Sequence, residues 1–243
     1  MRVPTAWLAA AGLLGSMIAD AQTPGPQTGG AGADFSGVYT AAYVSGAPAI
    51  RMPDSFPFTA EGGRAHAAYD PLVSSARVVA DCAAETLPAL LWTTNPMEIL
   101  QTAERIVFRY EEADTIRSIP WSAAPAADAQ PPSALGSSVA GWVDGALVIE
   151  TTHLMAGFMT HGRGYPVSGQ ARLTERYWRE PGQTDLQMAL VVDDPVNYTE
   201  PVTLGRTWIW SADERVRAWN CISLGARGSE PDIEELAQAL EAL

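Results

Sequence analysis

From Met97 onward, short stretches of alternating apolar and polar residues follow one another, and turn-forming residues end each stretch. Asp144-Gly145 is the strongest two-residue hairpin motif in the chain. Together with a strand from about Asp34 to Val44, this pattern predicts about ten strands at a spacing of roughly 8–15 residues. The other strands are predicted at Met97–Gln101, Arg105–Glu111, Thr115–Trp121, Ser138–Val143, Ala146–His153, Ala171–Arg179, Asp185–Asp193, Val202–Trp210 and Arg215–Cys221.

This order of elements predicts an all-β fold. Almost no helical pattern separates the strands, so they should form a single antiparallel meander and not βαβ units. An even, up-and-down meander most simply closes into a β-barrel, because closure removes exposed strand edges; a two-sheet sandwich is the competing arrangement. Two helices are expected beside the strands: a short one near residues 59–69 that Thr59 starts, and a C-terminal amphipathic one over residues 229–243.

The N-terminus is typical of an exported protein. Arg2 supplies a positive end, an apolar stretch runs from Ala6 to Ile18, and Ala19-Asp20-Ala21 fits the small-x-small cleavage pattern. Residues 1–21 are therefore predicted to be a signal peptide, although a buried N-terminal helix would have a similar apolar run. Residues 22–33 should form a flexible tether and residues 34–228 the one barrel domain. No other run approaches the ~20 apolar residues that span a bilayer, so membrane insertion is not expected.

The charged residues exclude several classes of function. The chain has 15 basic and 28 acidic residues, a net charge of −13, and every basic residue is arginine. A chain so acidic is repelled by phosphate, so nucleic-acid binding is not expected. The absence of lysine excludes Schiff-base chemistry, pyridoxal phosphate anchoring and P-loops. Any cation in a binding site must be a guanidinium, which suits an oxyanion.

The two cysteines, Cys82 and Cys221, are predicted to form one disulfide bond. An exported protein meets an oxidising compartment, and no C-x-x-C spacing supports a reactive thiol pair. The expected location is periplasmic or secreted.

Known catalytic motifs are missing from the sequence. His66, His153 and His161 have no recognised metal-ligand spacing, so no metal is expected, and neither G-x-S-x-G nor G-x-G-x-x-G occurs in a fitting context. What remains is a set of charged residues within strand patterns, which either face water or line a polar barrel interior. They are Glu98, Arg109, Arg117, Glu150, Glu175, Arg176, Asp193 and Arg206.

An interior with Arg, Glu and Tyr among Trp and Met suits a small, partly aromatic ligand with an anionic or phenolic oxygen. His153, Glu175 and His161 are the candidate acid/base groups. Arg109 and Arg117 are expected to hold the oxygen, and Tyr198 to donate a hydrogen bond. The glycine-rich segment 153–169 is expected to be a long, mobile loop, either a lid over a pocket or a plain surface loop. No cofactor is expected.

Several motifs extend over most of the chain from Asp34 to Cys221. They are Phe-Ser-Gly-Val-Tyr at 35–39, Pro-Met-Glu-Ile at 96–99, Arg-Ile-Val-Phe-Arg-Tyr-Glu at 105–111, Gly-Trp-Val-Asp-Gly-Ala-Leu-Val-Ile-Glu-Thr at 141–151, Glu-Arg-Tyr at 175–177 and Asp-Asp-Pro-Val-Asn-Tyr-Thr at 193–199. In these motifs the chain resembles a family of exported, largely uncharacterised bacterial proteins. It departs from that family in the glycine-rich segment and at Asp144-Gly145, where Gly-Asp is more usual. The resemblance implies export and a lipocalin-like barrel.

Three functions are compatible with these expectations. The first is an exported, cofactor-independent lyase or isomerase that moves a proton on a small aromatic or phenolic compound, such as a lignin-derived phenolic; the choice of substrate rests on analogy of fold. The alternative is a periplasmic carrier without turnover, and the third is an envelope interaction module. A lyase needs two titratable groups that converge at the floor of a pocket, whereas a carrier needs only one orienting charge. The oligomeric state stays open.

Overall fold

The computed structural model of the protein describes residues 32–41, 50–71, 82, 84–121, 130–160 and 162–221. Strands make up most of its regular structure. They are β1 (Gly37–Ala41), β2 (Ile50–Arg51), β3 (Met97–Gln101), β4 (Arg105–Tyr110), β5 (Ile116–Pro120), β6 (Ser137–Val143), β7 (Ala146–Thr152), β8 (Gly157–Phe158), β9 (Pro166–Val167), β10 (Arg172–Trp178), β11 (Leu186–Asp193) and β12 (Val202–Ser211). The helical elements are the α-helix α1 (Ala60–Ala67) and the 3-10 helices η1 (Ala89–Trp92) and η2 (Glu112–Asp114).

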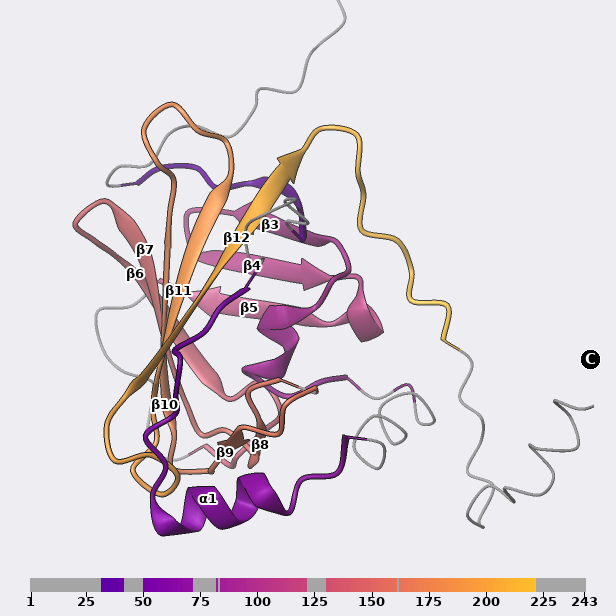
Figure 1. Ribbon diagram of the computed structural model, residues 1–243. Helices are drawn as coiled ribbons and strands as arrows, with labels where there is room; N and C mark the ends of the chain where they lie inside the picture. Colours follow the sequence, from indigo (N-terminus) through magenta and orange to yellow (C-terminus); the bar gives the residue numbers. More distant parts are fainter. Residues whose placement is uncertain are drawn as a thin grey trace, which may run out of the picture.

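The main sheet forms one nearly closed ring, which confirms the predicted all-β barrel. Nine of its ten strands follow one another in the order β5-β4-β3-β1-β12-β11-β10-β7-β6, and β2 pairs with β12 off this path. Neighbours along this path are antiparallel, and β1 near the start of the chain pairs directly with β12 near its end. That pairing joins the two ends of the meander, so the arrangement is a barrel and not two separate sheets. Figure 1 shows β3, β4 and β5 crossing β10, β11 and β12 at a steep angle.

The ring has a seam between β5 and β6. Nine strands that alternate in direction leave one pair of neighbours parallel, and β5 and β6 are that pair. Among the described residues a single parallel bridge, between Trp121 and Ala140, joins them through the backbone. Parallel neighbours need a long crossover connection, and residues 121–136, which are rich in proline and alanine, separate these two strands in the sequence.

The prediction of a last strand at Arg215–Cys221 is wrong, because these residues form no strand. β12 already has β11 on one side and β1 on the other, so no free edge remains for a hairpin partner. The chain after β12 instead runs along the β4–η2 connection as an irregular strap, residues 212–221. Its backbone donates hydrogen bonds to two side chains there, from the Arg217 amide to Glu111 at 2.9 Å and from the Trp219 amide to Asp114 at 3.0 Å. Without this strand the ring has nine strands instead of the predicted ten. An odd number of alternating strands leaves one parallel pair, which is the seam.

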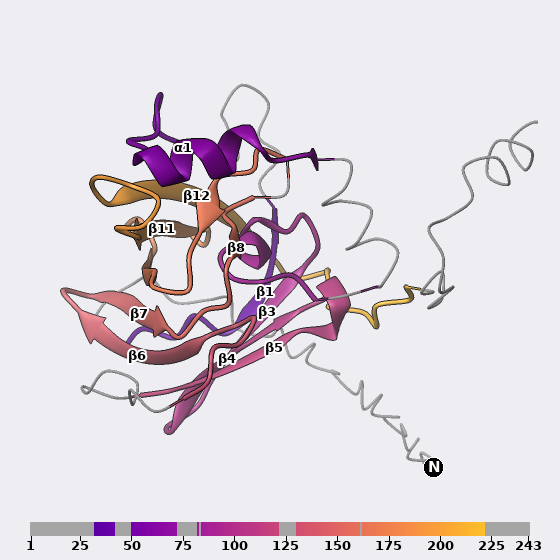
Figure 2. The ribbon, with the colours of Figure 1, turned by 90° about the horizontal axis from the view of Figure 1, so that it is seen from below.

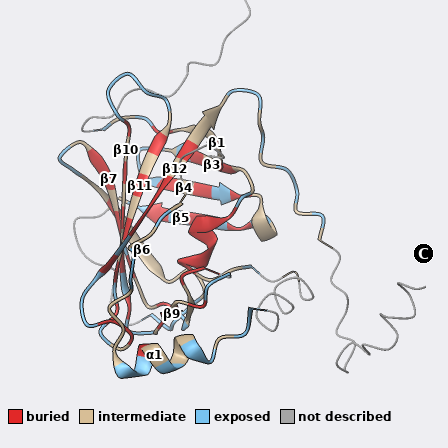
Figure 3. Ribbon diagram, in the orientation of Figure 1, coloured by how far each residue is buried: buried red, intermediate tan, exposed pale blue. Residues whose placement is uncertain are grey.

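Alternate residues of each strand face the interior, as Figure 3 shows by the red bands along the ring. On β12, Leu204, Arg206 and Trp208 are buried, whereas Thr203 is exposed. Most inward side chains are apolar or aromatic and make one continuous core. Arg117, Glu175 and Arg206 are exceptions, because they are charged and face inward with the core residues.

The predicted helix near residues 59–69 is confirmed as α1, which lies at one end of the barrel (Figures 1 and 2). Thr59 caps it by accepting a hydrogen bond from the Gly62 amide at 3.0 Å. Gly62 packs so closely on the chain that a Cβ there would lie 2.1 Å from the Asn197 carbonyl oxygen. A side chain at this position would therefore push α1 off the barrel.

The glycine-rich segment 153–169 is not the loose loop that its composition predicts. Leu154, Met159 and Val167 are buried in the core, and β8 pairs with β9. The segment carries enough apolar side chains to pack against the end of the barrel, which outweighs the flexibility of its glycines. Residue 161 lies outside the described residues.

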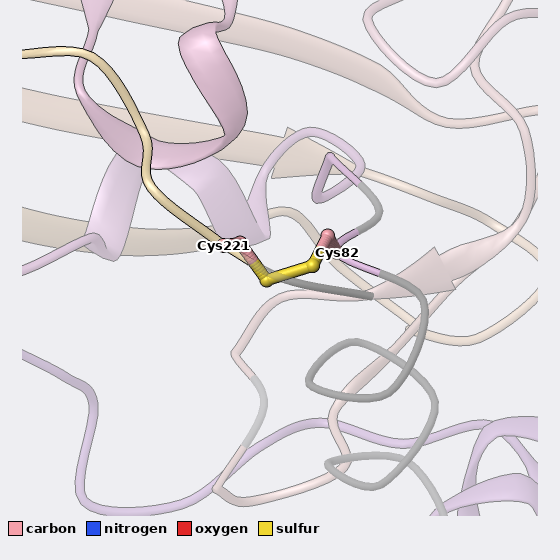
Figure 4. The surroundings of a disulfide bond; sticks show 2 residues. All are labelled: Cys82 and Cys221. Carbon is pink, nitrogen blue, oxygen red and sulfur yellow. A yellow bond between two sulfur atoms is a disulfide. The ribbon is translucent and has the colours of Figure 1, made fainter. Parts of the chain in front are cut away.

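The predicted disulfide bond between Cys82 and Cys221 is confirmed (Figure 4). It ties the strap to the segment that leads into η1. The predicted signal peptide, nearly all of the tether and the C-terminal helix lie outside the described residues. Within those residues, no helix has both the length and the apolar character needed to cross a membrane.

Candidate functional site

Arg117 and Glu175, two of the predicted site residues, meet inside the barrel. Arg117 faces inward from β5 and Glu175 faces inward from β10. The guanidinium donates two hydrogen bonds to the carboxylate, from Nη2 to Oε1 at 2.7 Å and from Nη1 to Oε2 at 3.1 Å. The two side chains are 2% and 0% exposed. The ion pair therefore crosses the interior between two strands that are not neighbours in the ring.

Two buried tyrosines lie beside this ion pair. The Tyr177 hydroxyl donates a hydrogen bond to Glu175 Oε2 at 2.7 Å. Burial, and then the negative charge of Glu175, raise the pKa of Tyr177 well above its usual value. Burial also raises the pKa of Tyr110 to about 12, against the opposing effect of Arg117. Both phenols therefore stay neutral at physiological pH and can donate a hydrogen bond.

The same cluster spans the seam of the barrel. Arg117 Nη2 lies 3.5 Å from Ser138 Oγ on β6, and that hydroxyl lies 2.7 Å from Thr151 Oγ1 on β7. Burial alone would lower the pKa of Arg117, but the Glu175 carboxylate outweighs it and the pKa lies above its ordinary value. The side chains thus connect β5 to β6, β7 and β10 where the backbone has one bridge. This arrangement stabilises the closed ring.

A buried turn of helix, η1, lies next to the interior. All four of its residues are buried. The Arg206 side chain on β12 donates a hydrogen bond from Nη1 to the Leu91 carbonyl at 2.9 Å and stacks on the Trp208 indole at 3.9 Å. Glu175, Arg117 and Tyr177 are buried as well, so the interior cluster is out of contact with solvent.

The other predicted site residues lie elsewhere. Arg109 is on the outer face of β4, where it pairs with Glu98 of β3. Tyr198 lies outside the ring, where its hydroxyl donates to the Pro166 carbonyl at 2.8 Å and its ring stacks on Phe58 at 5.5 Å. His153 follows the end of β7, beyond the register position of Glu175, and its Nδ1 lies 2.8 Å from Thr152 Oγ1. His161 lies outside the described residues. The structure therefore brings together two of the six predicted residues.

A pocket of about 720 Å³ opens at the end of the barrel beside η1. Its walls come from β2 and the residues after it, from η1 and its flanks, from η2, and from the turn between β8 and β9. Ile50, Met52 and Trp92 give it an apolar side, and its charged residues are Arg51, Glu85, Glu112 and Arg163. The pocket therefore combines an aromatic wall with charges in a space of the size that small ligands occupy.

Arg163 is the guanidinium placed to meet a ligand in this pocket. Its Nη1 lies 3.7 Å from the Met52 sulfur, and it forms no ion pair with any described residue. Arg51 points differently, because β2 pairs Arg51 with the outward-facing Gly205 of β12. Its Nη1 donates to Thr207 Oγ1 at 3.4 Å, also on the outer face. The Arg51 guanidinium thus lies against the outside of the barrel.

Two further pocket residues, Trp92 and Thr160, are buried and have a polar side-chain atom without a hydrogen-bond partner among the described residues. They are 7% and 9% exposed. Neither Trp92 Nε1 nor Thr160 Oγ1 has a hydrogen-bond partner among the described residues. Neither residue stands out as a candidate in the sequence, because the stretch around Trp92 has no strand or helix pattern and Thr160 is one polar residue within the glycine-rich segment. No local signal marks either position.

No three His, Cys, Asp or Glu side chains of the described ranges come together as a metal site would require. The chain matches no known protein family, and no curated protein is similar enough to count as a relative. The geometry of the pocket and of the interior cluster therefore has to indicate the function.

Proposed function

We propose that the protein is an exported carrier that binds a small, partly aromatic molecule in the pocket beside η1. The observation that carries this proposal is the pocket itself: about 720 Å³, with the Trp92 ring in its wall and Arg163 at its edge. Drug-sized organic molecules are bound in pockets of roughly 300–1,000 Å³ with apolar walls and a few polar groups.

Arg163 favours a ligand with an anionic or phenolic oxygen. Arg163 is exposed, and no carboxylate of the described residues neutralises it. A guanidinium can hold a carboxylate or phenolate by two parallel hydrogen bonds. One orienting cation beside an aromatic wall is sufficient for binding, and binding alone requires no acid/base pair.

Export is part of the proposal and is supported by two features. The N-terminus has the composition of a signal peptide, and a disulfide bond joins Cys82 to Cys221, as is usual in oxidising compartments. Cell fractionation followed by intact-mass measurement tests it. A periplasmic or secreted product cleaved after Ala21 would support export, and an uncleaved cytosolic product would refute it.

Binding can be measured by calorimetric titration of the purified protein with benzoates and hydroxycinnamates. Arg163→Gln should weaken binding of the carboxylates by about tenfold, the value of one charge-assisted hydrogen bond pair exposed to solvent. Arg105→Gln is the matched control, since Arg105 is an exposed arginine on β4 that bonds Ser118 on the outer face. No binding by any compound, or equal losses in the two variants, would refute the pocket assignment.

A second candidate function is cofactor-independent proton transfer, as in a lyase or isomerase, at the interior cluster. The observation that favours it is the 2.7 Å contact between the Tyr177 hydroxyl and Glu175 Oε2, beside a permanent cation. Such a trio could move a proton on a phenolic substrate. Because Glu175 is fully buried, part of the surrounding structure would have to move before any substrate reached it.

Mass spectrometry separates the two functions. The protein is incubated with phenolic dimers and hydroxycinnamates, beside a Glu175→Gln variant whose folding is checked by circular dichroism. Product that forms with the wild type and is lost with the variant would establish an enzyme. Tight retention of unchanged compound would establish a carrier.

A further inference from the structure

Three apolar side chains lie close together on the outer face of β3, β4 and β5. Leu100 is 40% exposed and Ile116 is 58% exposed. Leu100 pairs directly with Val107, and Ile116 lies diagonally across from Val107 on the next strand. Single apolar residues on a surface are ordinary, but neighbouring ones form a patch of the kind that another segment or molecule covers.

The same face is positively charged, although the chain as a whole has a net charge of −13. Arg105 and Arg109 point outward from β4, and both are exposed. Glu98 is the one carboxylate that these three strands present outward, and it pairs with Arg109. Arg105 donates to the Ser118 hydroxyl at 3.0 Å and forms no ion pair with any described residue. An apolar, acidic segment would therefore complement this face.

The strap leads the C-terminal part of the chain to the edge of this face. Its backbone donates hydrogen bonds to Glu111 and Asp114. Glu111 directly follows β4, and Asp114 precedes β5 by two residues. Figures 1 and 2 show the strap, in yellow, passing this end of the two strands. The disulfide bond holds Cys221 at the end of the strap, so the chain continues from a fixed point beside the face.

The chain beyond the strap has the complementary chemistry. Residues 229–243 contain five acidic residues and no basic one. In the amphipathic helix that the sequence predicts, Ile233, Leu236 and Leu240 share one side and Glu241 lies at its edge.

The lengths also agree. A helix of this size is about 22 Å long, and the six-residue β4 is about 20 Å long. Residues 222–228 span at most about 25 Å when extended. The predicted helix can therefore start at the near end of the face and cover it.

We propose that residues 229–243 bind as an amphipathic helix to the outer face of β3, β4 and β5. Leu236 and Leu240 contact the apolar patch, and the acidic side chains lie beside Arg105 and Arg109. A second copy of the chain fits this face less well, because a symmetric contact would bring the same arginines together. The proposal goes beyond the proposed function and is independent of the ligand in the pocket.

Because the chain has no lysine, one introduced lysine can report on its neighbours. Arg105→Lys keeps the charge and supplies the single side-chain amine, which a water-soluble carbodiimide joins to a nearby carboxylate as an amide, with release of a urea. Peptide mass spectrometry of the full chain should find the amine joined to acidic residues of 229–243. The yield should exceed that of Arg172→Lys about tenfold, because a docked helix holds its carboxylates at a high effective concentration. Arg172 is exposed on the outer face of β10, five places along the ring from β4.

A second change separates docking from the proximity of a tethered tail. Leu236→Asp places a charge in the apolar contact and, in the Arg105→Lys chain, should lower the yield about tenfold. Gln238→Asp is the matched control, because it adds the same charge on the opposite side of the helix and should leave the yield unchanged. A yield that Leu236→Asp does not lower, or one equal to that of Arg172→Lys, would overturn the proposal. Cross-links that join two chains would also overturn it and would assign the face to a second copy.

Discussion

The interior cluster and the pocket are two polar regions of one barrel, and they differ in how their arginines are paired. Inside the ring, Arg117, Glu175 and Tyr177 hydrogen-bond to one another and are closed off from solvent. In the pocket, Arg163 is exposed and forms no ion pair with any described residue. The two regions lie on either side of η1, whose Leu91 carbonyl accepts a hydrogen bond from the interior and whose Trp92 lines the pocket.

This difference separates stability from recognition. Polar groups that satisfy one another stabilise a particular strand arrangement, here the parallel seam between β5 and β6. An exposed guanidinium without a counter-ion among the described residues, such as that of Arg163, can instead hold a charged group of a ligand. Changes in the interior cluster should therefore lower the free energy of unfolding and leave ligand affinity unchanged. Changes in the pocket should weaken ligand binding and leave the free energy of unfolding unchanged.

The largest expected effect comes from Glu175→Gln. It removes the countercharge of a buried guanidinium, so the free energy of unfolding should fall by about 3–5 kcal/mol. Urea denaturation followed by circular dichroism measures it. The double change Arg117→Met with Glu175→Leu should lose much less, because no uncompensated charge stays buried. A single variant as stable as the wild type would show that the ion pair does not hold the ring.

Removal of the disulfide bond tests how far the barrel depends on covalent links outside the ring of strands. Replacement of Cys82 and Cys221 by serine releases the strap from the segment that leads into η1, and the free energy of unfolding should fall by about 2–5 kcal/mol. The far-ultraviolet circular dichroism spectrum should stay that of the barrel, since the strand pairings do not involve either cysteine. Loss of the barrel spectrum under native conditions would show that the ring needs the strap to close.

The buried tyrosines predict a dependence on alkaline pH. Tyr39 and Tyr110 have pKa values of about 12 in the folded protein, chiefly because of burial, against about 10 in an unfolded chain. As pH rises above 10 the unfolded state loses these protons first, so stability is full below pH 10 and falls as pH rises toward 12. The expected loss is about 2 kcal/mol for each tyrosine. Urea denaturation at stepwise pH measures it, and Tyr110→Phe should reduce the slope; an unchanged slope would contradict the assignment.

The strands could be predicted because the alternation of apolar and polar residues is visible within each short stretch of sequence. Of the nine strands predicted from Met97 onward, eight correspond to strands of the ring. It could not predict that Arg215–Cys221 would find no free edge, because that depends on β1 pairing with β12. Arg109 and Arg117 looked equivalent as candidates, yet they face opposite sides of the barrel wall, which the strand register decides.

The site residues divide in the same way. Arg117 and Glu175 were both candidates, but their contact spans non-neighbouring strands and no sequence spacing indicates it. Trp92 lies in a stretch without any periodic pattern, and its burial arises only when η1 packs at the end of the barrel. A sequence shows which strands contain charged residues, but it does not show which partners the fold brings to those charges.

The smallest expected effect concerns Ser138, which links the ion pair to the seam. Its hydroxyl lies 2.7 Å from Thr151 Oγ1 and 3.5 Å from Arg117 Nη2. Ser138→Ala should lower the free energy of unfolding by about 1 kcal/mol, the net value of a partly buried hydrogen bond. Ser118→Ala is its control, because Ser118 accepts its hydrogen bond from Arg105 on the exposed face and should cost less than about 0.5 kcal/mol. If the two variants lose equal stability in urea, Ser138 adds nothing to the seam, and the Arg117–Glu175 pair and the Trp121–Ala140 bridge hold it alone. A larger loss for Ser138, with unchanged affinity for the benzoates, would extend the interior cluster to β6 and keep it distinct from the pocket.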